Sequence, residues 1–318
     1  MIDVSVVIVS MNNLKYLYPC LDGIKEHTKC NYEVFVVAYL FDANNLNKLK
    51  QDYPWVQVIE SNEIRGFSEN NNLALRRALG KYCFVVNDDT EMRMSVIDEL
   101  LNTIELLPQN TAIVSPITYN VDGTVQRCGK RRYTLFSRIM DFMWLSKYLY
   151  RKSKYVDQKG LFQTYNISGA CFLIKTSVFK SVGWFDERYF FCPEDIALST
   201  QLNKMGYTCW VQSSAKITHF GGGTWSKTLV ATKPASVKGD VIFYGDGNFL
   251  KENVLRMFAL VSYSIKVFYW MLKKGDSINA KKRTMILANK HAIIALFSSK
   301  TPKELFVHYY TELQNKGR

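Results

Sequence analysis

The chain has 318 residues, of which 47% are hydrophobic and 22% charged, a composition typical of folded globular proteins and not of disordered ones. The net charge of +13 is uneven: residues 251–318 carry +9, residues 130–160 carry +7, and the remainder is slightly acidic. A uniformly basic surface would indicate nucleic acid, so we expect no nucleic-acid partner. Two local basic blocks instead predict that particular segments meet an anionic surface.

Seven cysteines are scattered through the chain, with no C-x-x-C pair. An odd, unclustered set in a chain that opens MIDVSVVIVS, without the pattern of a signal peptide, predicts reduced thiols and a cytoplasmic protein. We expect the thiols to act as small buried hydrophobic groups, and we assign no cysteine nucleophile.

The first ninety residues alternate between strand-like and helix-like patterns. The predicted strands are Val4–Val9, Glu33–Ala38, Val56–Glu60 and Tyr82–Val86, and the predicted helices are Leu14–Glu26, Leu46–Asp52 and Asn70–Leu79. Apolar runs rich in β-branched residues, separated by helices, are typical of an α/β fold. We therefore predict a Rossmann-like, mostly parallel sheet flanked by helices, with ligands outside the carboxyl ends of the strands.

The remaining chain has an irregular middle and a helical end. A strand is predicted at Ala170–Ile174, a helix at Glu194–Met205, a strand at Tyr207–Val211 and a flexible glycine loop at 219–223. From Lys251 the pattern is helical to the end. We predict a domain at 1–250, with a basic, aromatic insertion around 130–160, and a helical C-terminal region at 251–318.

Three short polar clusters are candidates for chemistry. Asp88-Asp89 follows an apolar strand, and two adjacent carboxylates there favour either a divalent cation that grips a diphosphate or a turn cap. Glu194-Asp195 opens a predicted helix, where acids either cap the helix or act as a base. His219 precedes three glycines and is either structural or a metal ligand.

Taken in order, these clusters resemble the motifs of the family 2 inverting glycosyltransferases, which have the GT-A fold. The similarity is to the branch that includes rhamnosyltransferases of bacterial surface polysaccharides such as O-antigen, and it covers about residues 3–225. It depends on four motifs: VSVVIVSMNN, RGFSENNNLALRRALGKYCFVVNDDTE, SGACFLIKTSVFKSVGWFDERYFFCPEDIAL and ITHFGGGTW.

The resemblance implies a role for each matching residue. Asp89 would hold Mn²⁺ or Mg²⁺, His219 would complete the metal site, and Asp195 would be the catalytic base. The positions that match the nucleotide-sugar site are Ser10, Asn12, Gly66, Asn71, Asn87 and Asp88. The positions that match the acceptor side are Trp184, Phe185, Asp186 and Glu194.

The sequence departs from the family pattern in two places. After the second strand the family usually has an acid that recognises the base, but here the chain has Ala38 and Tyr39, which puts uracil or thymine recognition in doubt. Beyond Asp195 the family often has a second acid and then an arginine, whereas this chain has Ala197 and Gln201. Basic residues such as Arg65 would then have to supply the missing contacts.

The function implied is transfer of a hexose or deoxyhexose, such as rhamnose, from a dTDP- or UDP-linked donor to a growing, polyprenyl-linked glycan acceptor. Two alternatives stay open: a nucleotidyltransferase, which also uses acids at strand ends with a metal, and a degenerate, glycan-binding scaffold suggested by the departures. The fold alone does not decide among them.

An apolar segment at Val254–Leu272 is interrupted by Arg256 and Lys266, so we expect no membrane-spanning helix. Its aromatic residues and flanking lysines predict a peripheral element on the anionic inner face of the plasma membrane. A helical subdomain with a solvated basic face is the alternative. The basic, aromatic stretch Lys130–Lys154 permits the same two interpretations.

Overall fold

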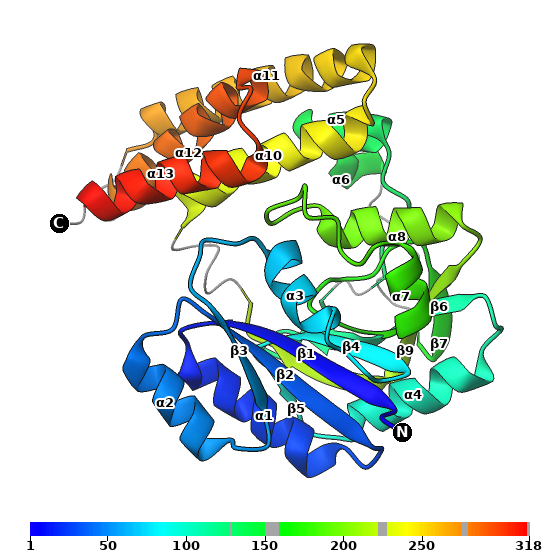
Figure 1. Cartoon of the computed structure of the whole chain (residues 1–318). Helices are drawn as coiled ribbons and strands as arrows, with labels where there is room; N and C mark the ends of the chain where they lie inside the picture. Colours follow the sequence, from blue (N-terminus) through cyan, green and yellow to red (C-terminus); the bar gives the residue numbers. More distant parts are fainter. Residues whose placement is uncertain (127–128, 150–158, 222–227, 275–278, 317–318) are drawn as a thin grey trace. The chain divides into compact units, whose positions relative to one another are not determined.

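The computed structural model describes residues 1–126, 129–149, 159–221, 228–274 and 279–316 (Figure 1). The chain forms two compact units. The first comprises Met1–Arg132, Ser153–Asp186 and Glu194–Gly221, and the second comprises Tyr133–Lys152, Glu187–Pro193 and Gly222–Arg318. Parts of the predicted basic insertion (150–158) and glycine loop (222 and 223) lie outside the described residues.

Four parallel strands in the order β3-β2-β1-β4 form one half of the sheet in the first unit. They are β1 (Val4–Met11), β2 (Tyr32–Tyr39), β3 (Gln57–Ser61) and β4 (Tyr82–Asn87), joined through α1 (Leu14–His27), α2 (Ala43–Asp52) and α3 (Phe67–Leu75). The predicted β-α-β rhythm is therefore confirmed. Because the strands are parallel, their carboxyl ends lie at one edge of the sheet.

The other half of the sheet is mixed, so the sheet as a whole is less parallel than predicted. Beyond β4 the order is β8-β6-β9-β5, with β7 also paired to β9. Of these neighbours only β6 and β9 run parallel. The elements are β5 (Thr90–Met92), α4 (Val96–Leu106), β6 (Thr111–Tyr119), β7 (Leu161–Thr164), β8 (Cys171–Lys175), α7 (Thr176–Ser181), α8 (Glu194–Lys204) and β9 (Thr208–His219).

Alternation along the strands builds a separate core on each face of the sheet. In β1, Val4, Val6 and Ile8 pack in one cluster, which includes apolar residues of α1 and α4. Val7 points the other way, into a cluster that includes Leu75 of α3 and Phe172 of β8. Successive strand residues face opposite sides, so an apolar run without polar alternation is what a sheet covered on both faces requires.

The second unit is helical. It contains α5 (Leu135–Phe142), α6 (Ser146–Leu149), α10 (Leu229–Gly245), α11 (Phe249–Leu272), α12 (Asn279–Phe297) and α13 (Pro302–Lys316). Helix α10 packs against α11, α12 and α13, around a core that includes Val241, Leu255 and Ala292. The helices that precede Lys251 in this unit include α10, which begins at Leu229, and the predicted boundary at 250 falls within the first turn of α11.

Candidate functional site

The carboxyl edge of the parallel strands gathers several of the predicted donor-binding residues. Ser10 ends the buried part of β1, and its hydroxyl donates to Oδ2 of Asp88 at 2.6 Å. Burial, and to a smaller degree the charge of Asp89, raises the pKa of Asp88 to about 7. Two adjacent carboxyl groups therefore lie where β4 ends, and burial disfavours the charged form of Asp88.

Asn12 follows β1 in a left-handed conformation (φ 47°), which asparagine tolerates better than most residues. Its amide donates to Asp42 at 2.8 Å and its oxygen accepts from Asn45 at 2.9 Å. The Asp42 carboxylate also caps α2 by accepting from the Asn45 N–H, and these hydrogen bonds lower the pKa of Asp42. An acid thus lies just after β2, three residues beyond Tyr39, although sequence reasoning did not single it out.

Asp89 and His219 are brought together by a short antiparallel pairing of β5 with the end of β9, in which Thr90 lies opposite His219. His219 Nε2 is 3.2 Å from Asp89 Oδ1 and 3.5 Å from the Asn87 amide nitrogen. The histidine is the last residue of β9 and not part of a flexible loop, because strand pairing with β5 extends β9 well past the predicted end at Val211.

Gln126 contacts the other ring nitrogen of His219 and was not predicted. Its Oε1 lies 3.0 Å from Nδ1, and its amide donates to the His219 carbonyl at 3.1 Å. An acceptor at Nδ1 favours the tautomer that carries its proton there, which leaves the Nε2 lone pair directed at Asp89. In that tautomer Nε2 carries no proton and faces Asp89.

The other two donor-site predictions have clear local roles. Gly66 is the residue before α3, and its N–H donates to the Glu69 carboxylate at 3.1 Å. Asn71 is buried, and its amide donates to the Phe67 carbonyl one turn earlier at 2.9 Å. Helix α3 begins at Phe67, three residues earlier than predicted, because this capping contact fixes its start.

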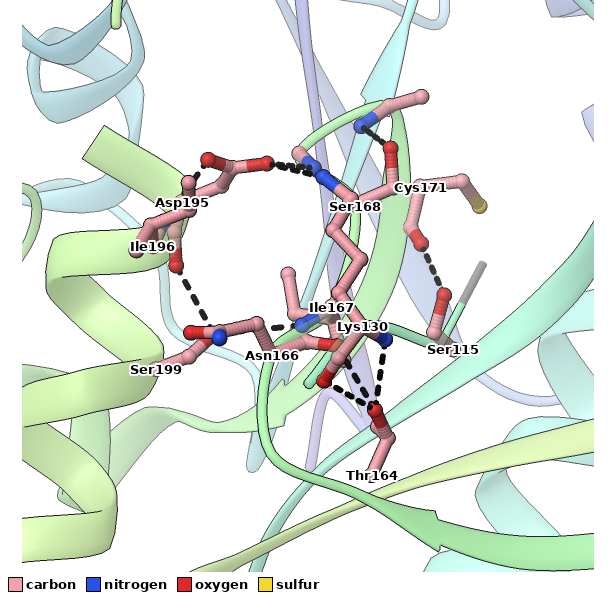
Figure 2. Close-up of polar contacts among 12 residues, drawn as sticks. Ser115, Lys130, Thr164, Asn166, Ile167, Ser168, Cys171, Asp195, Ile196 and Ser199 are labelled. Carbon is pink, nitrogen blue, oxygen red and sulfur yellow. Dashed lines mark hydrogen bonds and ion pairs between the residues drawn. The ribbon is translucent and has the colours of Figure 1, made fainter. Parts of the chain in front are cut away.

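Asp195, the predicted base, lies in the first turn of α8 and accepts three hydrogen bonds (Figure 2). Its Oδ1 accepts from the N–H of Ile196 at 2.7 Å, and its Oδ2 accepts from the N–H of Gly169 and from Lys130 Nζ, both at 3.1 Å. The neighbouring Glu194 is buried, its Oε2 has no hydrogen-bond partner, and burial raises its pKa well above the usual value. Burial thus favours the protonated form of Glu194, while the carboxylate oxygens of Asp195 face three N–H donors.

Two consecutive residues, Gly169 and Ala170, connect the surroundings of Asp195 to the strand end that carries Asp89. Gly169 donates its N–H to Asp195, and the next residue, Ala170, accepts the N–H of Asn87 at 2.9 Å. The strand end that carries Asn87, Asp88 and Asp89 is thus hydrogen-bonded to the segment that holds Asp195. The structure brings together the predicted metal ligands and joins them to the predicted base through residues 169 and 170.

The segment 184–186, which was predicted to bind the acceptor, is held in place by contacts with neighbouring side chains. The Trp184 ring contacts Phe179 with centroids 5.4 Å apart, and Trp184 has a left-handed backbone (φ 69°). Buried Asn72 fixes the segment by donating to the Phe185 carbonyl at 2.9 Å and accepting its N–H at 3.1 Å. Sequence reasoning missed Asn72, although it belongs to the asparagine run that follows Gly66.

The amino-acid sequence is also similar to that of a known protein family. The sequence profile of the family described as "Glycosyl transferase family 2" matches residues 5–183, more than half of the chain. The chain belongs to this family of glycosyltransferases.

Two known glycosyltransferases are similar in sequence to part of this chain. An N-acetylglucosaminyl-diphospho-decaprenol L-rhamnosyltransferase of Mycobacterium tuberculosis is 26% identical over 174 residues, covering 52% of this chain and 55% of the relative. The low-salt glycan biosynthesis hexosyltransferase Agl10 of Haloferax volcanii is 28% identical over 204 residues, covering 61% and 59%. The chain spans little more than half the length of these relatives.

Two solved structures share the fold at low sequence identity. GalNAc-T7, determined with UDP, GalNAc and Mn²⁺, has a TM-score of 0.59 at 15% identity and covers 99% of this chain and 58% of its own. The mannosyltransferase PcManGT of Pyrobaculum calidifontis, determined with GDP-Man and Mn²⁺, has a TM-score of 0.51 at 16% identity, covering 92% and 85%. The predicted GT-A fold is therefore confirmed.

Proposed function

We propose that this protein is an inverting glycosyltransferase that moves a hexose or deoxyhexose from a nucleoside diphosphate sugar to a glycan acceptor. The observation that carries the proposal is the connection of two chemically distinct groups by residues 169 and 170. On one side lie Asp89 and His219, 3.2 Å apart, and on the other lies Asp195 with three donors to its carboxylate. A diphosphate site connected in this way to a base suits a displacement in which the acceptor hydroxyl attacks as the nucleoside diphosphate leaves.

The residues at the end of β4 fit a divalent cation. Among the described residues no cluster of three or more His, Cys, Asp and Glu side chains could hold a metal alone. Asp89 and Nε2 of His219 supply two ligands, so donor phosphates and water would complete the coordination, as Mg²⁺ and Mn²⁺ commonly require. Burial disfavours the charged form of Asp88, and a cation bound beside it would favour that form. Once bound, the ion would neutralise charge that develops on the leaving diphosphate.

Asp195 acts on the acceptor. Its Oδ1 accepts one hydrogen bond from Ile196, and a carboxylate oxygen can accept a second from an acceptor hydroxyl. As that hydroxyl oxygen bonds to the anomeric carbon, the bond from this carbon to the diphosphate oxygen breaks and the hydroxyl proton passes to Asp195. One displacement inverts the configuration, and the nucleoside diphosphate leaves.

The name of one relative supports a particular acceptor class. The rhamnosyltransferase relative is named for a decaprenol-diphosphate-linked acceptor. We therefore propose a polyprenyl-linked glycan of the cell envelope as the acceptor, and the resemblance of the motifs to those of rhamnosyltransferases leads us to propose a dTDP- or UDP-linked sugar as the donor. In this proposal Asn12 and Asp42, which lie after β1 and β2 and are hydrogen-bonded to each other, bind the nucleoside side of such a donor.

The donor can be identified by thermal unfolding in the presence of UDP-, dTDP- and GDP-sugars, with and without Mn²⁺. A ligand that binds only the folded protein raises the apparent stability in proportion to RT ln(1 + [L]/Kd), so the true donor gives the largest Mn²⁺-dependent shift. Release of nucleoside diphosphate from that donor should fall by about 10²- to 10⁴-fold in Asp195→Asn, with little change in donor affinity. Release of pyrophosphate would instead indicate a nucleotidyltransferase. Glycan binding without turnover of any donor would indicate a scaffold.

The exposed face of α11 supports a peripheral membrane location. An uncharged apolar stripe runs along the helix at helical spacing, formed by the exposed residues Leu250, Met257, Val261, Ile265, Phe268 and Leu272. The helix is long and apolar enough to cross a membrane, and only 22% of its most apolar window is buried. Its opposite face packs in the helical core through Leu255, Ala259 and Tyr263.

An anionic lipid surface suits this stripe better than a second copy of the chain. The segment 251–318 that carries the stripe has a net charge of +9, so two copies of this segment would repel each other, whereas anionic headgroups would attract it. Lys273 and Lys274 follow the helix directly. Each lysine near an anionic leaflet contributes about 1 kcal/mol, screened beyond a Debye length of roughly 8–10 Å. We therefore infer that α11 lies along the membrane surface, because its inner face is occupied by the other helices of its unit.

Flotation with vesicles tests this location. The protein should bind vesicles rich in phosphatidylglycerol at low salt, bind phosphatidylcholine vesicles weakly, and dissociate at high salt. Ile265→Ser with Phe268→Ser should abolish binding, while Leu79→Ser with Leu106→Ser, two exposed leucines of the first unit, should not. Protein that stays on the vesicles after high salt and carbonate would indicate a spanning helix. A dimer that binds no lipid would indicate that a second copy covers the stripe. A protein that neither binds vesicles nor dimerises would contradict the proposal.

A further inference from the structure

We propose that Lys130 is a positioning residue for the transfer reaction: its ammonium group holds Oδ2 of Asp195 and presents Oδ1 to the acceptor as an ionised base. This inference rests on the proposed function. Lys130 belongs to the basic stretch that the sequence suggested for a membrane surface. Its side chain is instead only 23% exposed and forms an ion pair with Asp195, whose side chain is 16% exposed.

The backbone of Lys130 is fixed by a bridge to the segment that precedes Gly169. Lys130 and Asn166 exchange both backbone hydrogen bonds, at 3.0 and 2.9 Å. The Thr164 hydroxyl contacts the same peptide, accepting the Lys130 N–H at 2.9 Å and donating to the Lys130 carbonyl at 3.0 Å. Figure 2 shows Lys130 between Thr164 and Asp195, with its side chain directed at the carboxylate. These contacts fix the point from which the Lys130 side chain reaches Asp195.

The two carboxylate oxygens of Asp195 accept different numbers of hydrogen bonds. The Lys130 ammonium and the Gly169 N–H both donate to Oδ2, whereas Oδ1 accepts from Ile196. The Ser199 hydroxyl donates to the Asp195 carbonyl and fixes the same turn of α8. Rotation of the carboxylate would break contacts on both oxygens. Oδ1 is therefore the oxygen with capacity for the acceptor hydroxyl.

Lys130 also affects which of two adjacent carboxyl groups, Glu194 or Asp195, carries the negative charge. Glu194 and Asp195 interact electrostatically, and the charged groups that bear on Glu194 are Asp195 and Lys130. Two neighbouring carboxyls in a partly buried site do not both ionise easily. The ammonium is bonded to Asp195, so it favours the charge on Asp195 and leaves the proton on buried Glu194. Without the lysine, protonation of Asp195 would become easier and the base would be lost at higher pH.

The test compares Lys130→Met, Lys130→Arg and the wild type. Lys81→Met serves as the matched control, because Lys81 forms an exposed ion pair with Glu105 at 2.9 Å in the same unit. Release of nucleoside diphosphate is measured against pH, with Mn²⁺ and the UDP- or dTDP-sugar that gives the largest thermal shift. In Lys130→Met we expect kcat at neutral pH to fall about 10²-fold and donor KM to stay constant. The acid limb of the rate profile should move up by about one to three pH units, and Lys130→Arg should restore it.

A second measurement does not depend on activity. The carbon-13 carboxyl signal of Asp195, identified by its loss in Asp195→Asn, should titrate at higher pH in Lys130→Met than in the wild type. If circular dichroism shows that Lys130→Met is unfolded, Lys130→Gln replaces it. An unchanged titration midpoint, or a wild-type acid limb in the neutral variant, overturns the role of Lys130. If wild type and Lys81→Met turn over no donor, the proposed function fails, and the carboxyl titration still decides the role of Lys130.

Discussion

At the scale of single residues, the carboxylates were easier to predict than the groups that hold them. Asp89 and Asp195 stand in motifs whose order along the chain indicates their chemistry. Lys130 stands in a basic, aromatic stretch without clear periodicity, where a long polar side chain looks solvated, and Gln126 lies in the polar turn region just before it. Only the antiparallel bridge to Asn166 and the pairing of β5 with β9 reveal their partners. These contacts join residues 65 to 93 positions apart, which no local pattern encodes.

Asp89→Asn should abolish Mn²⁺-dependent donor binding with little loss of stability. The amide keeps the shape but removes the charge that a divalent cation requires. Isothermal titration of the selected UDP- or dTDP-sugar, with and without Mn²⁺, measures the effect. Asp52→Asn, which changes an exposed carboxylate bonded to Tyr18, is the control. Unchanged Mn²⁺-dependent affinity in Asp89→Asn would refute the ligand assignment.

Gln126→Leu should weaken Mn²⁺ binding by about 10- to 100-fold without removing a ligand. The leucine cannot accept the Nδ1 proton of His219, so the ring loses both its orientation and the preferred tautomer. Mn²⁺ affinity in the presence of the nucleoside diphosphate, followed by electron paramagnetic resonance, reports the change. Gln57→Leu, at an exposed position of β3, should bind Mn²⁺ like the wild type. If the two variants behave alike, Gln126 does not support the metal site.

At the scale of elements, the sequence predicts what is locally periodic and misses what depends on pairing. The four parallel strands are continuous apolar runs, so their positions were close to correct. Strand β5 has three residues, and β6 contains Pro116 and several polar side chains, so neither has a strand-like pattern of its own. Helix α10 contains Pro234 and two glycines and shows no apolar stripe, because it is buried among other helices. Tertiary contacts, not local propensity, create these elements.

Helices α5 and α10 are joined by an ion pair between Arg138 and Asp240, and both side chains are largely buried. Arg138→Met should destabilise the protein by about 3–5 kcal/mol, because it leaves the Asp240 charge without a partner. Lys50→Met, which breaks an exposed ion pair with Glu60, should cost about 0–1 kcal/mol.

Urea unfolding followed by circular dichroism measures both costs, and the double variant Arg138→Met with Asp240→Leu should recover most of the loss. Equal costs in the two single variants would show that the pair between α5 and α10 is not effectively buried.

At the scale of the whole molecule, stability should respond to pH through Lys233 of α10. Burial, and secondarily the charge of Lys266, lowers the pKa of Lys233 from 10.5 to about 8. Between these two values the unfolded chain binds a proton that the folded protein has released. The folded state therefore gains stability as pH rises from about 8 toward 10.5, by up to roughly 3 kcal/mol before any reduction for partial exposure.

The buried tyrosines titrate in the opposite sense above pH 10, so the effect must be measured as a difference. The free energy of unfolding of the wild type minus that of Lys233→Met should rise between pH 7.5 and pH 10. Lys290→Met, an exposed position of α12, should give a flat difference. A flat difference for Lys233 as well would mean that its ammonium stays protonated in the folded protein throughout that range.

The ion pair between Lys130 and Asp195 has a consequence for inhibitors. An acceptor mimic that carries an amine in place of the reacting hydroxyl would ordinarily be drawn to a bare catalytic carboxylate. Here an ammonium group already lies 3.1 Å from Oδ2, so a second cation would gain little attraction and would meet repulsion from the first. Uncharged mimics that donate a single hydrogen bond to Oδ1 should therefore bind this enzyme better than amines.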